Sequence, residues 1–261
     1  MQPLEGLKVL VTRPAHQAGG LCARIEAEGG TPVRFPTIGI ELPQDIRPAR
    51  ERLGRDHWDR VIFVSVNAVQ AALELDNRWQ TQPLVAVGNA TRNALIAAGL
   101  SVSLSPDDGF NSEALLALPA LQSVHGQSIL IVRGEGGRET LAETLRERGA
   151  VVEYAEVYRR VIPEADPHAL LQSWANGGVD IVTVTSNESL TNLVTMLGSA
   201  GHELLARTPL VGVSDRVLQI AASFGLPKPP IVAASAHDTD VLAALIAWRR
   251  SSGHKEALSH D

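Results

Sequence analysis

Polar residues that could bind an anion follow six apolar runs of the sequence. They are Gly, Ser, Thr, Asn and Arg, types that cap helix N-termini, where free backbone N–H groups and a partial positive charge attract carboxylate or phosphate. These turns lie at 12–14, 65–67, 88–91, 133–138, 185–188 and 213–216. Helix capping alone explains any single turn. Several turns around one cleft between two domains would suit a ligand with many carboxylates.

Three other residues could take part in chemistry. Arg13 and Arg133 occupy equivalent places in two similar segments, where an anion contact and a salt bridge at a strand end are equally good interpretations. Tyr158, one of only two tyrosines, lies in VYRR, where the chain leaves a strand–helix–strand unit. It either packs there or turns its hydroxyl to a cleft and donates a proton.

Other kinds of site are not indicated. The segment GEGGRE lacks the third glycine of a dinucleotide fingerprint, and no GxxxxGK[ST] occurs. Ser214 begins like a nucleophile elbow, but Arg216 stands where glycine is required. The eight histidines form no i, i+3 or i, i+4 pair, and Cys22 is the single cysteine, which fits a packed small hydrophobe better than a ligand. We therefore expect no metal and no cofactor.

The elements that must position these residues alternate between strand and helix. Continuous apolar runs such as VIFV, ILIV, IVTV and LVAV are typical of parallel strands covered on both faces. Amphipathic stretches such as 137–149 follow them. The pattern predicts an α/β protein with doubly wound parallel sheets.

An internal repeat organises the chain. At an offset of about 120 residues LKVLVTRP (7–14) matches QSILIVRG (127–134), and the blocks 59–73 and 84–100 match 179–193 and 210–226 at a similar offset. Gly29 and Gly149 end the first helix of each copy. The repeat indicates duplication and two similar domains of about five strands each.

Composition narrows the function further. The 261 residues carry a net charge of −6, and 44% are hydrophobic but only 4% aromatic, which argues against general nucleic-acid binding. No secretory signal and no apolar run of the roughly 20 residues that span a bilayer is visible. We expect a cytoplasmic protein, with no membrane or nucleic-acid partner, that acts on a small molecule or a protein.

Eight short motifs, taken in order, resemble the uroporphyrinogen-III synthase family. They are VTRP (11–14), FPTIGI (35–40), FVSVNAV (63–69), VGNAT (87–91), NSEAL (111–115), ILIVRGEGGRETL (129–141), VYRR (157–160) and TSNESL (185–190). The resemblance covers about residues 6–248 and implies two flavodoxin-like domains joined by a two-stranded β ladder. Residues 1–38 and 162–261 would form domain 1, residues 42–157 domain 2, and residues 38–42 and 158–162 the ladder.

The resemblance also implies an activity. The family cyclises hydroxymethylbilane, a linear tetrapyrrole with eight carboxylates, with loss of water and inversion of ring D, and uses no cofactor. Tyr158 matches the tyrosine that would protonate the leaving hydroxyl, and Thr91 matches a binding threonine. The expected substrate contacts are Thr12, Arg13, Ser65, Asn67, Thr91, Arg133, Arg138, Thr185, Ser186, Asn187 and Ser214. Asp215 departs from this pattern, since its carboxylate would repel those of the substrate. Glu113 could contact pyrrole N–H groups of the substrate or cap the following helix, and capping is the favoured interpretation.

Two other functions stay open on the sequence. A non-catalytic two-domain module could close on an anionic small molecule as a sensor. A protein–protein scaffold is less favoured, because no apolar helix face or heptad pattern stands out. We expect a monomer.

Overall fold

The computed structural model describes residues 2–76, 79–108, 111–226 and 231–257. The chain divides into two compact units, unit 1 (Met1–Gly39 and Val161–Asp261) and unit 2 (Ile40–Arg160). The domain limits expected from the sequence differ from these by three residues or fewer. The Pro-rich segment 227–230, expected to be extended, lies outside the described residues.

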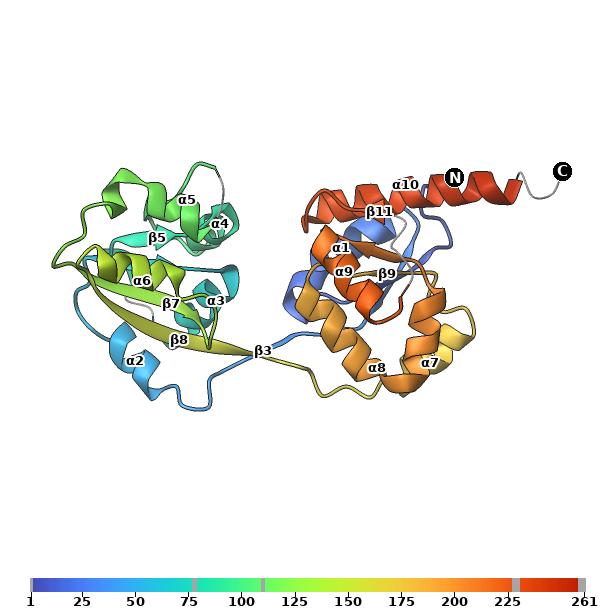
Figure 1. Cartoon of the computed structure of the whole chain (residues 1–261), viewed down its shortest axis with the longest axis horizontal. Helices are drawn as coiled ribbons and strands as arrows, with labels where there is room; N and C mark the ends of the chain where they lie inside the picture. Colours follow the sequence, from blue (N-terminus) through green and yellow to red (C-terminus); the bar gives the residue numbers. More distant parts are fainter. Residues whose placement is uncertain (1, 77–78, 109–110, 227–230, 258–261) are drawn as a thin grey trace. The chain divides into compact units, whose positions relative to one another are not determined.

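Unit 1 contains a five-stranded parallel sheet of order β11-β10-β9-β1-β2 (Figure 1). Its strands are β1 (Lys8–Val11), β2 (Thr31–Arg34), β9 (Ile181–Thr183), β10 (Leu210–Gly212) and β11 (Ile231–Val232). Its helices are α1 (Ala15–Ala27), α7 (His168–Ala175), α8 (Asn187–Arg207), α9 (Asp215–Ser223) and α10 (Asp238–Ala257). The last of these helices, α10, continues to Ala257.

Unit 2 contains a six-stranded sheet of order β3-β8-β7-β4-β5-β6. Its strands are β3 (Gly39–Glu41), β4 (Arg60–Phe63), β5 (Leu84–Ala86), β6 (Val102–Leu104), β7 (Ser128–Gly134) and β8 (Val151–Val161), and the pairs from β8 to β6 are parallel. Its helices are α2 (Arg47–Leu53), α3 (Val66–Leu75), α4 (Asn89–Ala97), α5 (Ser112–Ala117) and α6 (Thr140–Glu147), with 3₁₀ turns at Trp79–Thr81 and Pro119–Leu121.

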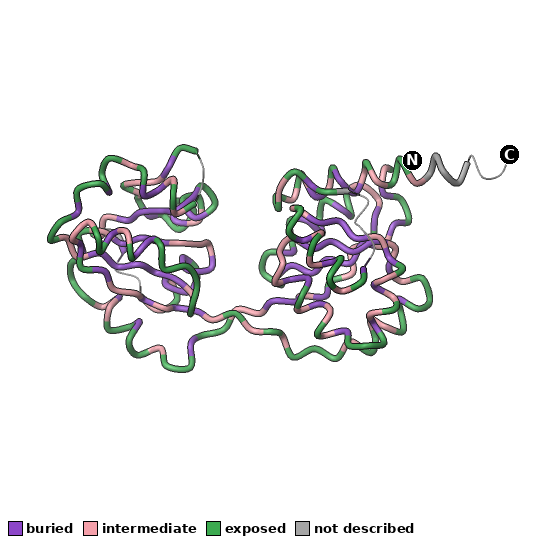
Figure 2. The backbone as a smooth tube through the Cα atoms, viewed as in Figure 1, coloured by how far each residue is buried: buried purple, intermediate pink, exposed green. Residues whose placement is uncertain are grey.

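The central strands of each sheet are buried on both faces, which explains their continuous apolar runs (Figure 2). In β1, Val9 and Val11 pack with α1 and α10, whereas Leu10 between them packs with α8 and α9 on the other face. In unit 2, Phe63 of β4 packs with α3, while its neighbour Ile62 packs with α5 and α6. Alternate side chains of one strand thus serve two core layers.

The sequence repeat corresponds to a repeat of topology. If β7, β8, β4, β5 and β6 are matched with β1, β2, β9, β10 and β11, as the aligned blocks require, both sheets have the same strand order. Gly29 and Gly149, which follow the first helix of each copy, both have φ of +84°. Unit 2 adds β3 at the edge next to β8.

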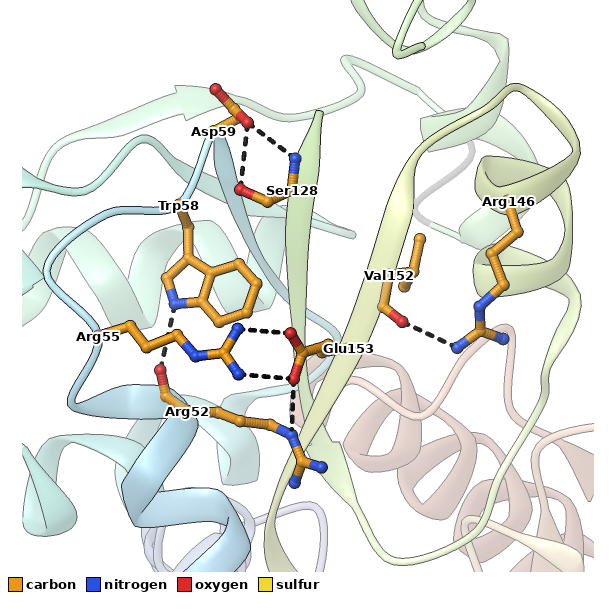
Figure 3. Close-up of polar contacts among 8 residues, drawn as sticks. All are labelled: Arg52, Arg55, Trp58, Asp59, Ser128, Arg146, Val152 and Glu153. Carbon is orange, nitrogen blue, oxygen red and sulfur yellow. Dashed lines mark hydrogen bonds and ion pairs between the residues drawn. The ribbon is translucent and has the colours of Figure 1, made fainter. Parts of the chain in front are cut away.

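A network of arginines fixes α2 and the loop after it to β8 (Figure 3). Glu153 of β8 accepts hydrogen bonds from Arg55 Nη1 at 2.5 Å and Arg52 Nε at 3.1 Å. The Arg55 guanidinium also lies 4.9 Å from the ring centroid of Trp58, whose Nε1 donates to the carbonyl of Arg52 at 3.1 Å. These contacts hold the segment that covers one face of the unit 2 sheet.

Candidate active site

A pocket of about 400 Å³ opens in unit 2 at the carboxyl ends of β4 and β7. These two strands are neighbours, but the chain leads from β4 to β5 on one side and from β7 to β8 on the other. The pocket therefore lies at a topological switch point, the usual ligand site of open α/β sheets. Its polar lining is Ser65, Ser112, Arg133, Glu135, Arg138, Tyr154, Tyr158 and Arg160, with the glycines at 134, 136 and 137.

Tyr158 forms part of the pocket wall from strand β8. Its residue is only 4% exposed, and its hydroxyl lies 3.2 Å from Ser65 Oγ. Its carbonyl accepts the backbone N–H of Glu135 at 2.7 Å, which ties the loop after β7 to β8. The phenol is thus held between two strand ends while still reaching the pocket.

Gly134 allows the Tyr158 ring to take this place. A Cβ atom at position 134 would lie 2.7 Å from Cε2 and Cζ of the ring, closer than any side chain tolerates. The β7–β8 register also shifts between Arg133 and Gly134, so that Arg133 pairs with Glu156 but Gly134 pairs with Tyr158. Such bulges redirect side chains, often beside active sites.

Arg133 is a buried cation whose charge is already compensated. Its Nη1 donates to Glu139 Oε1 at 2.8 Å, and its Nε lies 3.5 Å from Glu156 Oε1. Its guanidinium also lies 4.3 Å from the ring centroid of Tyr154. Hydrogen bonds from the Tyr154 hydroxyl and from Arg133 lower the pKa of Glu139, whereas burial and the bond to Glu139 raise that of Tyr154. Of the two interpretations of Arg133, an anion contact and a salt bridge at a strand end, the salt bridge is present.

Two further arginines, Arg138 and Arg160, line the pocket. Arg138 has a 75% exposed side chain and only a 3.7 Å ion pair with Glu113. Arg160 was not among the site residues predicted from the sequence, although its spacing from Tyr158 could have indicated it. It lies two residues beyond Tyr158 in a strand, and residues at that spacing point to the same face. Both can offer bidentate hydrogen bonds to a carboxylate.

Two other unit 2 candidates, Asn67 and Thr91, lie outside the pocket lining. Asn67 and Thr91 are buried in the first turns of α3 and α4. Ser65 caps α3 by accepting the backbone N–H of Ala68 at 3.1 Å. Helix α5 is capped by Asn111 and not by Glu113, which we expected in this role; Asn111 Oδ1 accepts the N–H of Ala114 at 2.8 Å. The pocket thus gathers Ser65, Arg133, Arg138 and Tyr158 among the predicted residues.

In unit 1 the first strand-end turn is closed. Thr12 is fully buried: its hydroxyl donates to the carbonyl of Thr183 at 2.8 Å and lies 2.8 Å from Ser189 Oγ. Arg13 is compensated like Arg133, by an ion pair with Asp238 and a hydrogen bond to the carbonyl of Ala236 at 2.6 Å. A ligand could reach neither residue without a rearrangement of this turn.

The other unit 1 candidates are helix caps and their neighbours. Ser186 caps α8 by accepting the N–H of Ser189 at 3.0 Å, and Ser214 caps α9 by accepting that of Val217 at 3.4 Å. Thr185 and Asn187 flank Ser186 and are partly exposed. Capping, the alternative weighed for every turn, is therefore present at both serines.

The described residues contain neither a membrane-spanning helix nor a cluster of metal-binding side chains. None of the helices there has both the length and the apolarity that spanning a membrane requires. Nor does that part of the chain bring together three or more His, Cys, Asp or Glu side chains as a metal site would need.

The fold and the pocket define a class: α/β proteins with parallel sheets and a pocket at the switch point of one sheet. Comparison with known proteins identifies the family. Residues 20–243 match the family model described as uroporphyrinogen-III synthase HemD. The chain is 35% identical over 227 residues to the uroporphyrinogen-III synthase of Salmonella typhimurium and 34% identical over 229 residues to that of Escherichia coli. Each alignment covers 84% of this chain and 92% of the relative. The chain belongs to the uroporphyrinogen-III synthase family.

Solved structures support the fold. The uroporphyrinogen-III synthetase of Helicobacter pylori matches 93% of this chain and 99% of its own, with a TM-score of 0.61 and 15% identity. A mutant uroporphyrinogen III synthase from Thermus thermophilus matches 98% of this chain and 100% of its own, with a TM-score of 0.56 and 21% identity. At such identities the likeness concerns the fold alone.

Proposed function

We propose that this protein is a uroporphyrinogen-III synthase, a lyase that cyclises hydroxymethylbilane to uroporphyrinogen III in tetrapyrrole (haem) biosynthesis. Membership of the family supports the reaction. The observation that carries the assignment of a site is the Tyr158 phenol, held in a pocket that Arg138 and Arg160 also line. A proton donor beside arginines suits a substrate that carries carboxylates and must lose a hydroxyl group.

In the proposed reaction Tyr158 protonates the hydroxyl group of the substrate. The C–O bond breaks, water leaves with the electron pair of that bond, and electrons from the pyrrole nitrogen stabilise the cation as an azafulvene. The substituted α carbon of ring D then attacks the methylene carbon that carried the hydroxyl group and gives a spiro intermediate. The bond from this α carbon to its original bridging carbon breaks, and the bridging carbon forms a new bond to the other α carbon of ring D, which closes the macrocycle with ring D inverted. The proton lost when the pyrrole regains aromaticity restores the phenol.

The protein must also favour one ring closure over another. Free hydroxymethylbilane closes by itself to the type I isomer without inversion. Every tenfold preference for the type III route needs about 1.4 kcal/mol of differential transition-state stabilisation. In this proposal Arg138 and Arg160 hold carboxylates so that the substituted carbon of ring D meets the reactive carbon first.

Finer parts of the proposal concern the rest of the chain. Each sheet would be flavodoxin-like, and the segments at β3 and the end of β8 would form the connecting ladder. The proposed enzyme is a cytoplasmic monomer. Further contacts with the substrate remain predictions at Asn67, Thr91, Arg133, Thr185, Ser186, Asn187 and Ser214. Thr12 and Arg13 are left out because they are closed off by their own hydrogen bonds.

An isomer assay tests the proposed function. Purified protein is incubated with hydroxymethylbilane that is generated in situ, without added metal or nucleotide. The products are then separated into type I and type III isomers. We expect the type III isomer to predominate and to form faster than the spontaneous product. Type I product alone, at the rate of the protein-free reaction, would rule the function out.

A further inference from the structure

We propose that Ser65 is a positioning residue that acts through Tyr158, and not a contact of the substrate as the sequence suggested. In this role its hydroxyl orients the phenol and stabilises the phenolate that forms when Tyr158 gives up its proton. The inference rests on the proposed function of Tyr158. Its starting observation is the 3.2 Å distance between Ser65 Oγ and Tyr158 Oη.

The hydrogen bonds around Ser65 allow it to donate to Tyr158, the direction that this proposal assigns. Ser65 Oγ already accepts the backbone N–H of Ala68 at 3.1 Å, so one of its acceptor positions is in use. Its own O–H remains available to donate to Tyr158 Oη. In this arrangement the proton of Tyr158 is free to point into the pocket, where a leaving hydroxyl could take it.

The same chain of bonds supports the charge that develops on the phenol. Ala68 lies in the first turn of α3, a helix of ten residues, where N–H groups carry partial positive charge. Ala68 donates to Ser65, and Ser65 donates to Tyr158. Hydrogen bonds to an anion are shorter and stronger than those to a neutral group, so this chain strengthens as the phenolate forms.

The phenol has little freedom to leave this hydrogen bond. Tyr158 belongs to the hydrophobic core cluster of unit 2 that also contains Val132 and Val157, and Gly134 lies against its ring. Since packing fixes the ring and Ser65 fixes the hydroxyl, the donor is preorganised before the substrate arrives.

Every proton that Tyr158 gives up during loss of the hydroxyl group returns to it later in the reaction. Tyr158 transfers its phenolic proton to the substrate hydroxyl, the C–O bond breaks, and water leaves with the bonding electron pair. The phenolate is held by the Ser65 hydrogen bond until the pyrrole proton released at ring closure returns to it. Ser65 keeps its own proton throughout, which distinguishes it from a proton relay.

Variants at positions 65 and 158 test this role in the isomer assay. Ser65→Ala removes both the hydroxyl and the helix cap, Ser65→Gly removes the hydroxyl but keeps most of the capping stability, and Ser65→Thr keeps both. Each is made in the native chain and in the Tyr158→Phe chain. Melting temperatures are recorded for every variant, so that any loss of folding is measured separately.

We expect Ser65→Ala and Ser65→Gly to lower kcat about 10- to 100-fold with little change in KM, because the bond lost is one to a developing anion. Ser65→Thr should restore most of kcat. In the Tyr158→Phe background, Ser65→Ala should lower kcat less than about twofold further, because its partner is already absent.

Several results would overturn the inference. A Ser65→Gly variant with native kcat would reduce Ser65 to a helix cap. If the fold-reductions in kcat of the two single variants multiplied in the double variant, Ser65 would act independently of Tyr158. An effect mainly on KM would likewise make Ser65 a substrate contact. Native protein that forms only type I product would overturn the proposed function as well, so the two failures are distinguishable.

Discussion

At the scale of single residues, the arginines near the strand ends differ in how their charges are paired. Arg13 and Arg133, equivalent in the repeat, are both buried and both neutralised by a carboxylate from the segment that leads into or begins a helix. Breaking such a pair would leave a buried charge without a partner, which is costly. Arg138 differs, because its ion pair with Glu113 is long and exposed, so breaking that pair would not leave a buried charge without a partner.

The phenol of Tyr158 gives the most direct prediction at this scale. We expect Tyr158→Phe to slow formation of the type III isomer by about 10- to 1000-fold, since general acid catalysis typically contributes this much or more and other groups can substitute in part. Binding of the substrate should be unchanged, because the ring and its packing remain. Steady-state kinetics together with equilibrium binding measure the two effects, and weakened binding with native kcat would contradict the role.

Gly134 gives a second prediction. In Gly134→Ala the new Cβ would lie 2.7 Å from the Tyr158 ring, so the ring must shift. The packing of Tyr158 in the core makes that shift costly. A displacement of the order of 1 Å can cost about 100-fold in rate, so we expect kcat to fall at least tenfold. Gly19→Ala in α1 is the matched control, since nothing lies within 4 Å of its Cβ position. Native activity in Gly134→Ala would show that the ring position is not limiting.

At the scale of elements, strand β8 has two tasks. Through Tyr158 and Arg160 it forms a wall of the pocket, and through Glu153 it anchors α2 and the loop that follows (Figure 3). Burial raises the pKa of Glu153, but the hydrogen bonds and charges of Arg55 and Arg52 together outweigh it and leave the pKa below its usual value. The carboxylate is therefore held in its ionised form by the fold.

The depressed pKa of Glu153 predicts a pH dependence of stability. Because the folded pKa of Glu153 lies below the unfolded one, the stabilisation is fully present above the unfolded pKa of about 4.5 and is lost as pH falls through the folded pKa. We expect Glu153→Gln to lower the free energy of unfolding by about 1 kcal/mol at pH 7. The difference from the native protein should shrink below pH 4.

Urea unfolding at pH 7 and at pH 3.5 measures this difference. Glu203→Gln is the control, because its ion pair with Arg207 is long and both side chains are exposed. A Glu153→Gln variant whose deficit stayed constant between the two pH values would show that the lost stability does not depend on the carboxylate charge.

At the scale of the whole molecule, the two units differ in how the chain builds them. Unit 2 is one continuous segment, whereas unit 1 combines the first 39 residues with those from 161 onward. A cut near residue 120, the offset of the repeat, would separate β4 and β5 from β7 and β8 of the same sheet. It would also leave β1 without its partner β9.

Fragments test this division. We expect residues 39–161 to fold alone, because they hold a complete sheet with a hydrophobic layer on each face. Residues 1–120 should not, since β4 would lose its neighbour β7 and leave an apolar edge open. Thermal melting followed by circular dichroism distinguishes the two. A cooperative transition in 1–120 but not in 39–161 would contradict the division.

Local signals in the sequence were sufficient for much of this protein. Apolar runs predicted parallel strands, because a strand buried on both faces has no polar side. Gly29 and Gly149 marked helix ends, and the serines before α3, α8 and α9 marked helix starts, because these requirements are satisfied within one turn of chain. The ordered motifs indicated the family, which the comparisons confirmed.

Only the tertiary structure decided which predicted residues reach the pocket. Arg13 meets Asp238 from 225 residues away, and the hydroxyl of Thr12 is used by Thr183 and Ser189, so no local pattern could show that they are closed off. The register shift beside Gly134, which places Tyr158 opposite it, depends on how β7 and β8 pair. The physical reason is that burial and charge compensation depend on neighbours in space, whereas periodicity and capping depend on neighbours along the chain.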